Sequence, residues 1–211
     1  MALFTEERLR ARVENQLRKG YSGSMYDSFD SKAKTILNES LNQQRTFSAT
    51  TNTYDIFLSH SSSDAALVAG LKLELEDLGY SVYVDWIEDP KLSRANVTKE
   101  TALVLQARMK QCKALLYAFS ENATNSKWMP WECGYFDGFD SKSIGEAVQH
   151  GHVAILPVVD EGQGTFKGQE YLGLYPLAEK GNYPRRNVDI HNQTDRTRYK
   201  HFDAWVANGH P

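Results

Sequence analysis

Short apolar stretches alternate with helical patterns through the middle of the chain. Runs rich in branched and aromatic residues predict buried strands over 54–58, 81–86, 114–119 and 153–159. Between these runs, apolar residues recur at helical spacing, most clearly in the leucines of 67–78. Strands that alternate with helices in this way predict right-handed βαβ units and a parallel sheet covered by helices on both faces.

The N-terminal part of the chain carries two helical patterns with no strand between them. Leu9, Val13 and Leu17 recur every four residues and predict an amphipathic helix over 6–19. A second helical pattern runs over 29–41. Two such helices have no core of their own, so they must cover either the main domain or a second subunit, and the pattern favours neither.

Glycines interrupt the C-terminal quarter of the chain, and its elements are short. The pattern predicts a short helix near 171–177, a fifth strand near 187–191 and a final helix within 194–207. We therefore predict an N-terminal helical extension over 1–52 and one α/β domain over 53–211.

Composition and charge narrow the possible partners. The chain has 41% hydrophobic and 24% charged residues with a formal net charge of -3, as in ordinary globular proteins. Acidic and basic residues are interleaved, so no basic stripe is available for a phosphate backbone and we expect no nucleic acid partner. No apolar run approaches the ~18 residues that span a bilayer, and the first residues lack a basic leader. We expect a cytoplasmic protein without membrane contact.

The cysteines and histidines do not form a recognisable metal site. Cys112 and Cys133 lack the spacing of a metal pair or a disulfide framework, so we expect two reduced, partly buried thiols. His150 and His152 flank a glycine, but no carboxylate or thiol lies at ligand spacing from them. The sequence predicts a solvated turn there, no metal site and no bound cofactor.

The predicted topology indicates where a ligand would bind. In an open parallel sheet, ligands bind beyond the carboxyl ends of the strands, where the strand order reverses. With the common strand order 2-1-3-4-5, that position lies between the first and third strands. The loops 59–64 and 120–132 should therefore meet at the site.

The second of these loops carries an acid among aromatic residues. Trp128 and Glu132 are four residues apart, so they share one face of a helix that Asn125 or Ser126 can cap. Cleavage of a glycosidic bond passes through an oxocarbenium-like state that a carboxylate can stabilise. The same glutamate could instead serve only the helix dipole. Its place at the sheet edge beside two tryptophans favours a chemical role.

Two other segments reach the same edge of the sheet. The loop after the first strand offers hydroxyl side chains and a histidine at a helix N-terminus, where an anion such as a phosphate can bind: Ser59, His60, Ser61 and Ser62. The same loop also fits a simple capped turn, and a strand-end histidine is more often a hydrogen-bonding partner than a base. At the end of the second strand, Asp85 could bind a ribose, and Trp86 could stack on a base or anchor the loop.

Three ordered stretches resemble a Toll/interleukin-1 receptor (TIR) domain. They are YDIFLSH at 54–60 followed by Asp64, GYSVYVD at 79–85, and SKWMPWE at 126–132. The resemblance covers about 53–160 well and the rest loosely. It implies a flavodoxin-like, five-stranded parallel sheet in the order 2-1-3-4-5.

The resemblance also implies an activity for the site. Enzymatic TIR domains cleave NAD+ at the nicotinamide glycosidic bond, and Glu132 matches their glutamate, with Trp128 preceding it as in bacterial members. It implies that Glu132 stabilises the ribosyl cation and that Trp128 stacks near nicotinamide, while 59–62, Asp85 and Trp86 shape the dinucleotide site. NAD+ is then the substrate rather than a cofactor.

The bacterial members that this chain resembles are sensors of Thoeris-type anti-phage defence. They convert NAD+ into a cyclic or otherwise modified ADP-ribose, a diffusible nucleotide that activates a separate effector protein. The resemblance therefore predicts an NAD+ glycohydrolase or ADP-ribosyl cyclase, and a homo-oligomer formed through the TIR domain and the N-terminal helices.

Two alternatives stay open at this point. A non-enzymatic TIR scaffold would self-assemble through the exposed loop 87–95, although a pure adaptor needs neither Trp128 nor Glu132. An enzyme like the nucleoside deoxyribosyltransferases would form a covalent ribosyl intermediate on the same glutamate. Nicotinamide release from NAD+ distinguishes the leading prediction from both.

Overall fold

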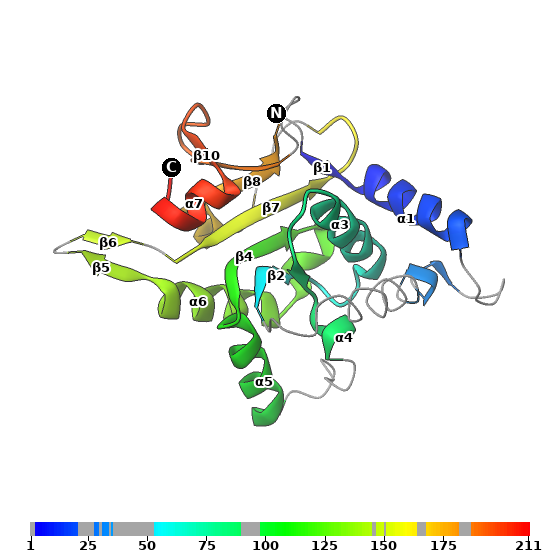
Figure 1. Cartoon of the computed structure of the whole chain (residues 1–211), viewed down its shortest axis with the longest axis horizontal. Coiled ribbons are helices and arrows are strands. Elements are labelled where there is room, and N and C mark those ends of the chain that lie inside the picture. The colour runs from blue at the N-terminus through cyan, green and yellow to red at the C-terminus, as the bar shows by residue number, and fades with distance from the viewer. Residues whose placement is uncertain are drawn as a thin grey trace.

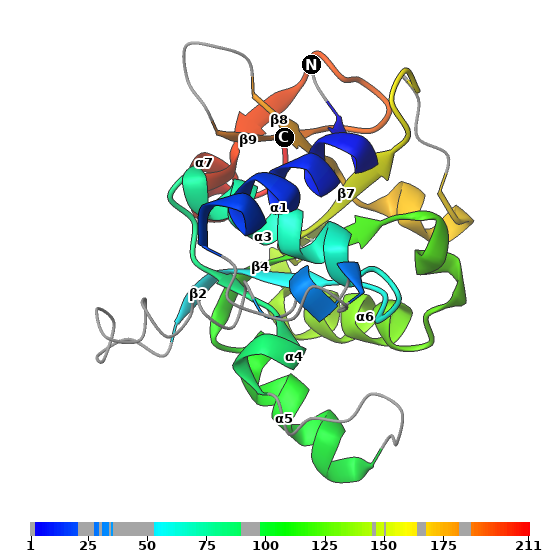
Figure 2. The ribbon, with the colours of Figure 1, turned by 90° about the vertical axis from the view of Figure 1, so that its right-hand side faces the viewer.

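The computed structural model describes most of the chain. The described residues are 3–20, 28–29, 31–33, 35, 53–89, 98–144, 147–149, 151–163, 168–181 and 187–211. Within them, an eight-stranded mixed sheet forms the centre of the molecule, and helices cover both of its faces (Figures 1 and 2).

Seven strands of the sheet are hydrogen-bonded in one continuous order, and an eighth strand pairs with one of them outside that order. Across the path the strands are β10 (Tyr199–His201), β9 (Val188–His191), β8 (Leu177–Lys180), β7 (Val153–Val159), β4 (Cys112–Phe119), β2 (Tyr54–Ser59) and β3 (Val82–Tyr83). The short strand β1 (Phe4–Thr5) pairs in parallel with the end of β7, which the sequence pattern did not predict. A separate hairpin of β5 (Lys142–Ile144) and β6 (Ala147–Gln149) projects beyond the main sheet (Figure 1).

The inner part of the sheet follows the predicted order. Strands β3, β2, β4 and β7 correspond to the second, first, third and fourth predicted strands, and all of them run parallel. Their order places the carboxyl ends of β2 and β4 side by side. The predicted meeting point of loops 59–64 and 120–132 is therefore present.

The prediction of an all-parallel, five-stranded sheet is wrong beyond β7. The short helix predicted near 171–177 is present as a 3-10 helix at Glu170–Leu174. The place of the fifth strand is taken by β8, which the sequence pattern did not predict, and the predicted fifth strand is β9, which runs antiparallel to β8. The link from β8 to β9 spans only 181–187, and a parallel crossover needs a dozen or more residues. The 3-10 helix η2 (Glu170–Leu174) lies just before β8, and β10 adds a second antiparallel strand.

One face of the sheet is covered by helices from both ends of the chain. These are α1 (Glu6–Gly20), α3 (Ala65–Asp77) and α7 (Phe202–Asn208). Leu9 and Val13 of α1 are fully buried in the core cluster on this face, and α1 crosses α3 (Figure 2). The first predicted helix therefore covers its own chain. Of the second predicted helix, Phe29 and Ala33 join the same cluster, and most of the remainder lies outside the described residues.

The opposite face is covered by α5 (Lys99–Met109) and α6 (Trp128–Asp140). Alternate strand residues such as Phe57, Leu115 and Tyr117 point to this face and pack with Cys133 and Phe136 of α6. The 3-10 helix η1 (Glu121–Asn125) connects β4 to α6, and the short helix α4 (Asp85–Glu88) follows β3. Most of the predicted assembly loop 87–95 lies outside the described residues.

The contact between α1 and α3 leads to a test of stability. A Cβ atom added at Gly70 of α3 would lie 2.6 Å from the backbone oxygen of Leu9. Gly70→Ala should therefore lower the free energy of unfolding by about 1–3 kcal/mol, although alanine is normally about 1 kcal/mol better than glycine within a helix. Urea denaturation measures the change.

A matched control lies in α6. At Gly134 an added Cβ meets no atom within 4 Å, so Gly134→Ala should be neutral or stabilising. Equal effects of the two substitutions on unfolding would contradict the close α1–α3 contact.

Candidate active site

The predicted acid lies at the junction of β2 and α6. Glu132 is on the second turn of α6 and is fully buried, and Ser59 is the last residue of β2. The Ser59 hydroxyl donates a hydrogen bond of 2.6 Å to Glu132 Oε2. The structure therefore brings together two predicted site residues that are 73 positions apart in sequence.

The start of α6 is held by a serine, as the sequence predicted. Ser126 Oγ accepts a hydrogen bond of 3.3 Å from the backbone nitrogen of Met129, and it lies just before the first helical residue, Trp128. Pro130 sits in the first turn, where its missing N–H costs no helical hydrogen bond. Trp128 is half-buried one turn before Glu132 and packs edge-on against Trp131, with ring centroids 5.2 Å apart.

The loop after β2 is tied to the loop after β4 by Asp64. Asp64 Oδ2 accepts a hydrogen bond of 2.5 Å from the Ser120 hydroxyl, and Oδ1 accepts one of 2.6 Å from Asn122 Nδ2. Asp64 occupies the N-cap position of α3, but its side chain makes no capping hydrogen bond. The carboxylate is turned toward the β4 loop instead. A negative group at this helix N-terminus also disfavours a phosphate there.

The other residues of the β2 loop differ in exposure. Ser61 is buried, and its hydroxyl accepts a weak hydrogen bond of 3.4 Å from the Ser63 backbone nitrogen. Ser62 is exposed at the tip of the loop. Of the four residues predicted in this loop, only Ser62 presents an open surface to a ligand.

The two ring nitrogens of His60 have different hydrogen-bond partners. His60 Nδ1 lies 2.8 Å from the Leu58 carbonyl oxygen, which can only accept, so Nδ1 carries the proton. Nε2 accepts a hydrogen bond of 2.9 Å from the indole N–H of Trp86, which can only donate. His60 is therefore a buried hydrogen-bonding partner. Trp86 anchors the loop through this bond, which is one of its two predicted roles.

The prediction that Asp85 and Trp86 end the second strand is wrong. Strand β3 stops at Tyr83, and the chain turns at Val84 into the short helix α4. The turn brings the fully buried Asp85 close to His60, with 3.5 Å between Asp85 Oδ1 and His60 Nε2. The half-buried Trp86 packs edge-on against the same imidazole.

Comparison with known proteins identifies the family. Residues 56–196 match the TIR domain family. The chain belongs to this family. The match spans β2 to the loop after β9, and the mixed sheet with helices on both faces is the form that the TIR domain takes here.

Two relatives of the TIR domain are informative through their names. "Probable 3' cyclic ADP-D-ribose synthase ThsB'" from Bacillus cereus (strain MSX-D12) is 43% identical over 210 residues, which cover 98% of each chain. "Putative cyclic ADP-D-ribose synthase TIR2" from Cytobacillus dafuensis is 32% identical over 83 residues, or 39% of this chain and 22% of that protein. The first likeness extends over the N-terminal helix as well as the TIR domain.

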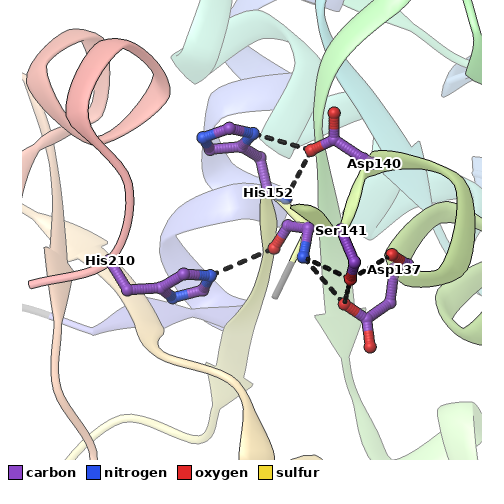
Figure 3. Close-up of polar contacts among 6 residues, drawn as sticks. Asp137, Asp140, Ser141, His152 and His210 are labelled. Carbon is purple, nitrogen blue, oxygen red and sulfur yellow. Dashed lines mark hydrogen bonds and ion pairs between the residues drawn. The ribbon is translucent and has the colours of Figure 1, made fainter. Parts of the chain in front are cut away.

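The far end of α6 is held by polar contacts with the start of β7 and the C-terminal tail (Figure 3). Asp137 Oδ1 accepts a hydrogen bond of 2.8 Å from the Gly151 nitrogen, and Asp140 Oδ2 accepts one of 2.7 Å from the His152 nitrogen. His210 Nε2 lies 3.1 Å from the Gly151 carbonyl oxygen. The same set of contacts positions the helix that carries the buried glutamate.

The prediction of a solvated turn at the histidine pair is wrong for His152. His152 Nδ1 lies 2.7 Å from Asp140 Oδ2, and the His152 ring packs edge-on against Trp205, so it is part of a packed contact. His150 lies outside the described residues. In the part of the chain that the structure describes, no group of side chains is arranged to hold a metal ion, and no helix is both long and apolar enough to cross a bilayer.

Sequence patterns did not indicate the contacts of three residues of this region. Asp64 was named as following the first TIR-like stretch, but no role was predicted for it. The hydroxyls of Tyr117 on β4 and Tyr171 in η2 lie 3.3 Å apart. Alternation along β4 could have placed Tyr117 on the α6 face, but nothing in the sequence relates it to a residue 54 positions away.

The thiols lead to a test of this packing. Burial raises the pKa of Cys133 to about 12, and burial also raises that of Cys112 well above its usual range. Both groups are therefore protonated thiols at pH 8 and are shielded from reagents. A disulfide reagent at pH 8 should label neither cysteine in the native protein and both in urea. Rapid labelling of the native protein would contradict the described burial.

Proposed function

We propose that the chain is an NAD+-cleaving TIR enzyme, an ADP-ribosyl cyclase of bacterial anti-phage defence. It would release nicotinamide and a cyclic ADP-ribose signal. The observation that carries the proposal is the buried Glu132, held by Ser59 where β2 and β4 end. The named relative with 43% identity over 98% of the chain supports the substrate and the cyclic product.

Glu132 supplies the negative charge that the reaction needs. When the bond between ribose C1 and the nicotinamide nitrogen breaks, its electron pair leaves with nicotinamide and a positive ribosyl centre forms. A carboxylate beside this centre stabilises it more strongly than it stabilises bound NAD+. The Ser59 hydroxyl orients the carboxylate, so we assign Ser59 a positioning role in addition to shaping the dinucleotide site.

The other residues predicted to form the site fall into a group with exposed surface and a buried group. Trp128 is half-buried one turn before Glu132, which suits stacking beside the nicotinamide ring. Ser62 and Trp86 retain exposed surface and can contact the dinucleotide directly. The buried group consists of His60, Ser61 and Asp85, and we propose that these residues act by holding the surrounding loops in place.

The burial of Glu132 bears on how the enzyme is controlled. Its side chain has no exposed surface in the single chain, so NAD+ reaches it only after neighbouring groups move. Self-association of the TIR domain is a suitable trigger for such a movement. We propose that copies assemble in the cytoplasm and that the diffusible product activates a separate effector protein. Because α1 buries its apolar face within its own chain, assembly would use other surfaces.

The decisive experiment substitutes the carboxylate. Glu132→Gln keeps the shape of the side chain but removes its charge, so nicotinamide release from NAD+ should fall at least about 100-fold. Purified protein is assayed concentrated and with extract of phage-infected cells, and products are separated by chromatography. Glu121→Gln, at an exposed glutamate of η1, is the matched control and should retain activity. Equal activity of the two variants would refute the proposal.

The positioning role of Ser59 has a separate test. Ser59→Ala leaves the carboxylate in place but removes the hydrogen bond that orients it, so kcat should fall about tenfold with little change in KM. Ser81→Ala is the matched control, because the Ser81 hydroxyl is bonded to Asp55 at the opposite end of β2. A rise in KM at constant kcat would show that Ser59 acts in binding rather than in orienting Glu132.

A further inference from the structure

Two tyrosine hydroxyls meet on the face of the sheet that α6 covers. Tyr117 projects from β4 and is fully buried, whereas Tyr171 belongs to η2 and is half-buried. Their hydroxyl oxygens lie 3.3 Å apart. The Tyr117 hydroxyl is therefore the inner one and is enclosed by protein. The Tyr171 hydroxyl is the outer one and belongs to a side chain with exposed surface.

Sheet register places this pair next to the Ser59–Glu132 contact. Ser59 and Tyr117 are directly paired residues of β2 and β4, so their side chains project from the same face of the sheet, toward α6. Burial is the main reason that the pKa of Tyr117 is raised, and the negative charge of Glu132 adds to it. Tyr117, the inner member of the hydroxyl pair, thus lies within electrostatic range of the carboxylate.

The outer hydroxyl can bind a further group. A separation of 3.3 Å is longer than the 2.7–2.8 Å usual for hydroxyl pairs, so Tyr117 holds Tyr171 weakly. A hydroxyl has one donor hydrogen and two acceptor lone pairs, and the pair uses only one of these sites on Tyr171. Burial also raises the pKa of Tyr171. At neutral pH it is a hydrogen-bonding group and not a base.

We propose that Tyr171 binds the ribose hydroxyl that captures the ribosyl cation, and thereby favours cyclic over linear ADP-ribose. The inference rests on the proposed function. In the cyclic product, a new bond joins a hydroxyl oxygen of the adenosine ribose to C1 of the ribose that carried nicotinamide. The bond from that C1 to nicotinamide has broken with its electrons on nicotinamide, and the hydroxyl proton leaves to solvent. If a water oxygen bonds to the same carbon instead, nicotinamide leaves in the same way, the water loses one proton to solvent, and the product is linear ADP-ribose. The choice depends on which oxygen is held closer.

The experiment measures the product ratio rather than the rate alone. Tyr171→Phe removes one hydroxyl and keeps the ring, and the ratio of cyclic to linear product from NAD+ should fall about fivefold, as expected for loss of one hydrogen bond. Total nicotinamide release should fall by a smaller factor. Tyr117→Phe should shift the ratio in the same direction, because Tyr171 then loses the partner that directs it. Thermal unfolding of each variant verifies that it is folded.

A neighbouring tyrosine provides the control. The Tyr175 hydroxyl donates to Asp137 Oδ2 at 3.2 Å and lies four residues after Tyr171. Tyr175→Phe should leave the product ratio unchanged. If the ratio of cyclic to linear product is unchanged in Tyr171→Phe, or shifts equally in Tyr171→Phe and Tyr175→Phe, the inference is overturned. Linear product alone from the wild type also overturns it while leaving NAD+ cleavage intact, whereas a wild type that releases no nicotinamide overturns the proposed function itself.

Discussion

The site depends on the hydrogen bond from Ser59 to Glu132. It joins the end of β2 to α6 over 2.6 Å, and both side chains are fully buried. A carboxylate without exposed surface is stable only when polar partners replace the water it has lost. The position of β2 relative to α6 therefore determines where the carboxylate points. The other polar contacts of the region keep these two elements in their places.

Helix α6 is located by contacts at both of its ends. At the start, Asp64 ties the β2 loop to Ser120 and Asn122, which lead through η1 into the helix. At the end, Asp137 and Asp140 accept hydrogen bonds from the start of β7, and the C-terminal His210 contacts the same backbone. Residues far from the TIR-like stretches thus help to hold the glutamate in place.

The same burial that orients the glutamate also keeps substrate away from it. An NAD+-cleaving enzyme whose carboxylate is enclosed would be inactive in the resting chain, and activation would consist of exposing a group that is already oriented. Such a design suits a signalling enzyme, because unregulated cleavage would deplete NAD+. Trp128, one turn before the glutamate on α6, is half-buried.

The sequence by itself predicted the strands of the inner sheet, since branched and aromatic runs and leucine periodicity are local signals. The order of these strands was taken from the common arrangement of such sheets and from the resemblance to TIR domains. With that order the carboxyl ends of β2 and β4 adjoin, which located Glu132 at the sheet edge. Local patterns could not determine the antiparallel strands β9 and β10, whose direction follows from a short link and from pairing across the sheet. Nor could they predict that Ser59 bonds Glu132, that Asp64 turns away from its helix, or that Tyr171 meets Tyr117. Those contacts join residues more than fifty positions apart, and only the tertiary structure brings them within hydrogen-bonding distance.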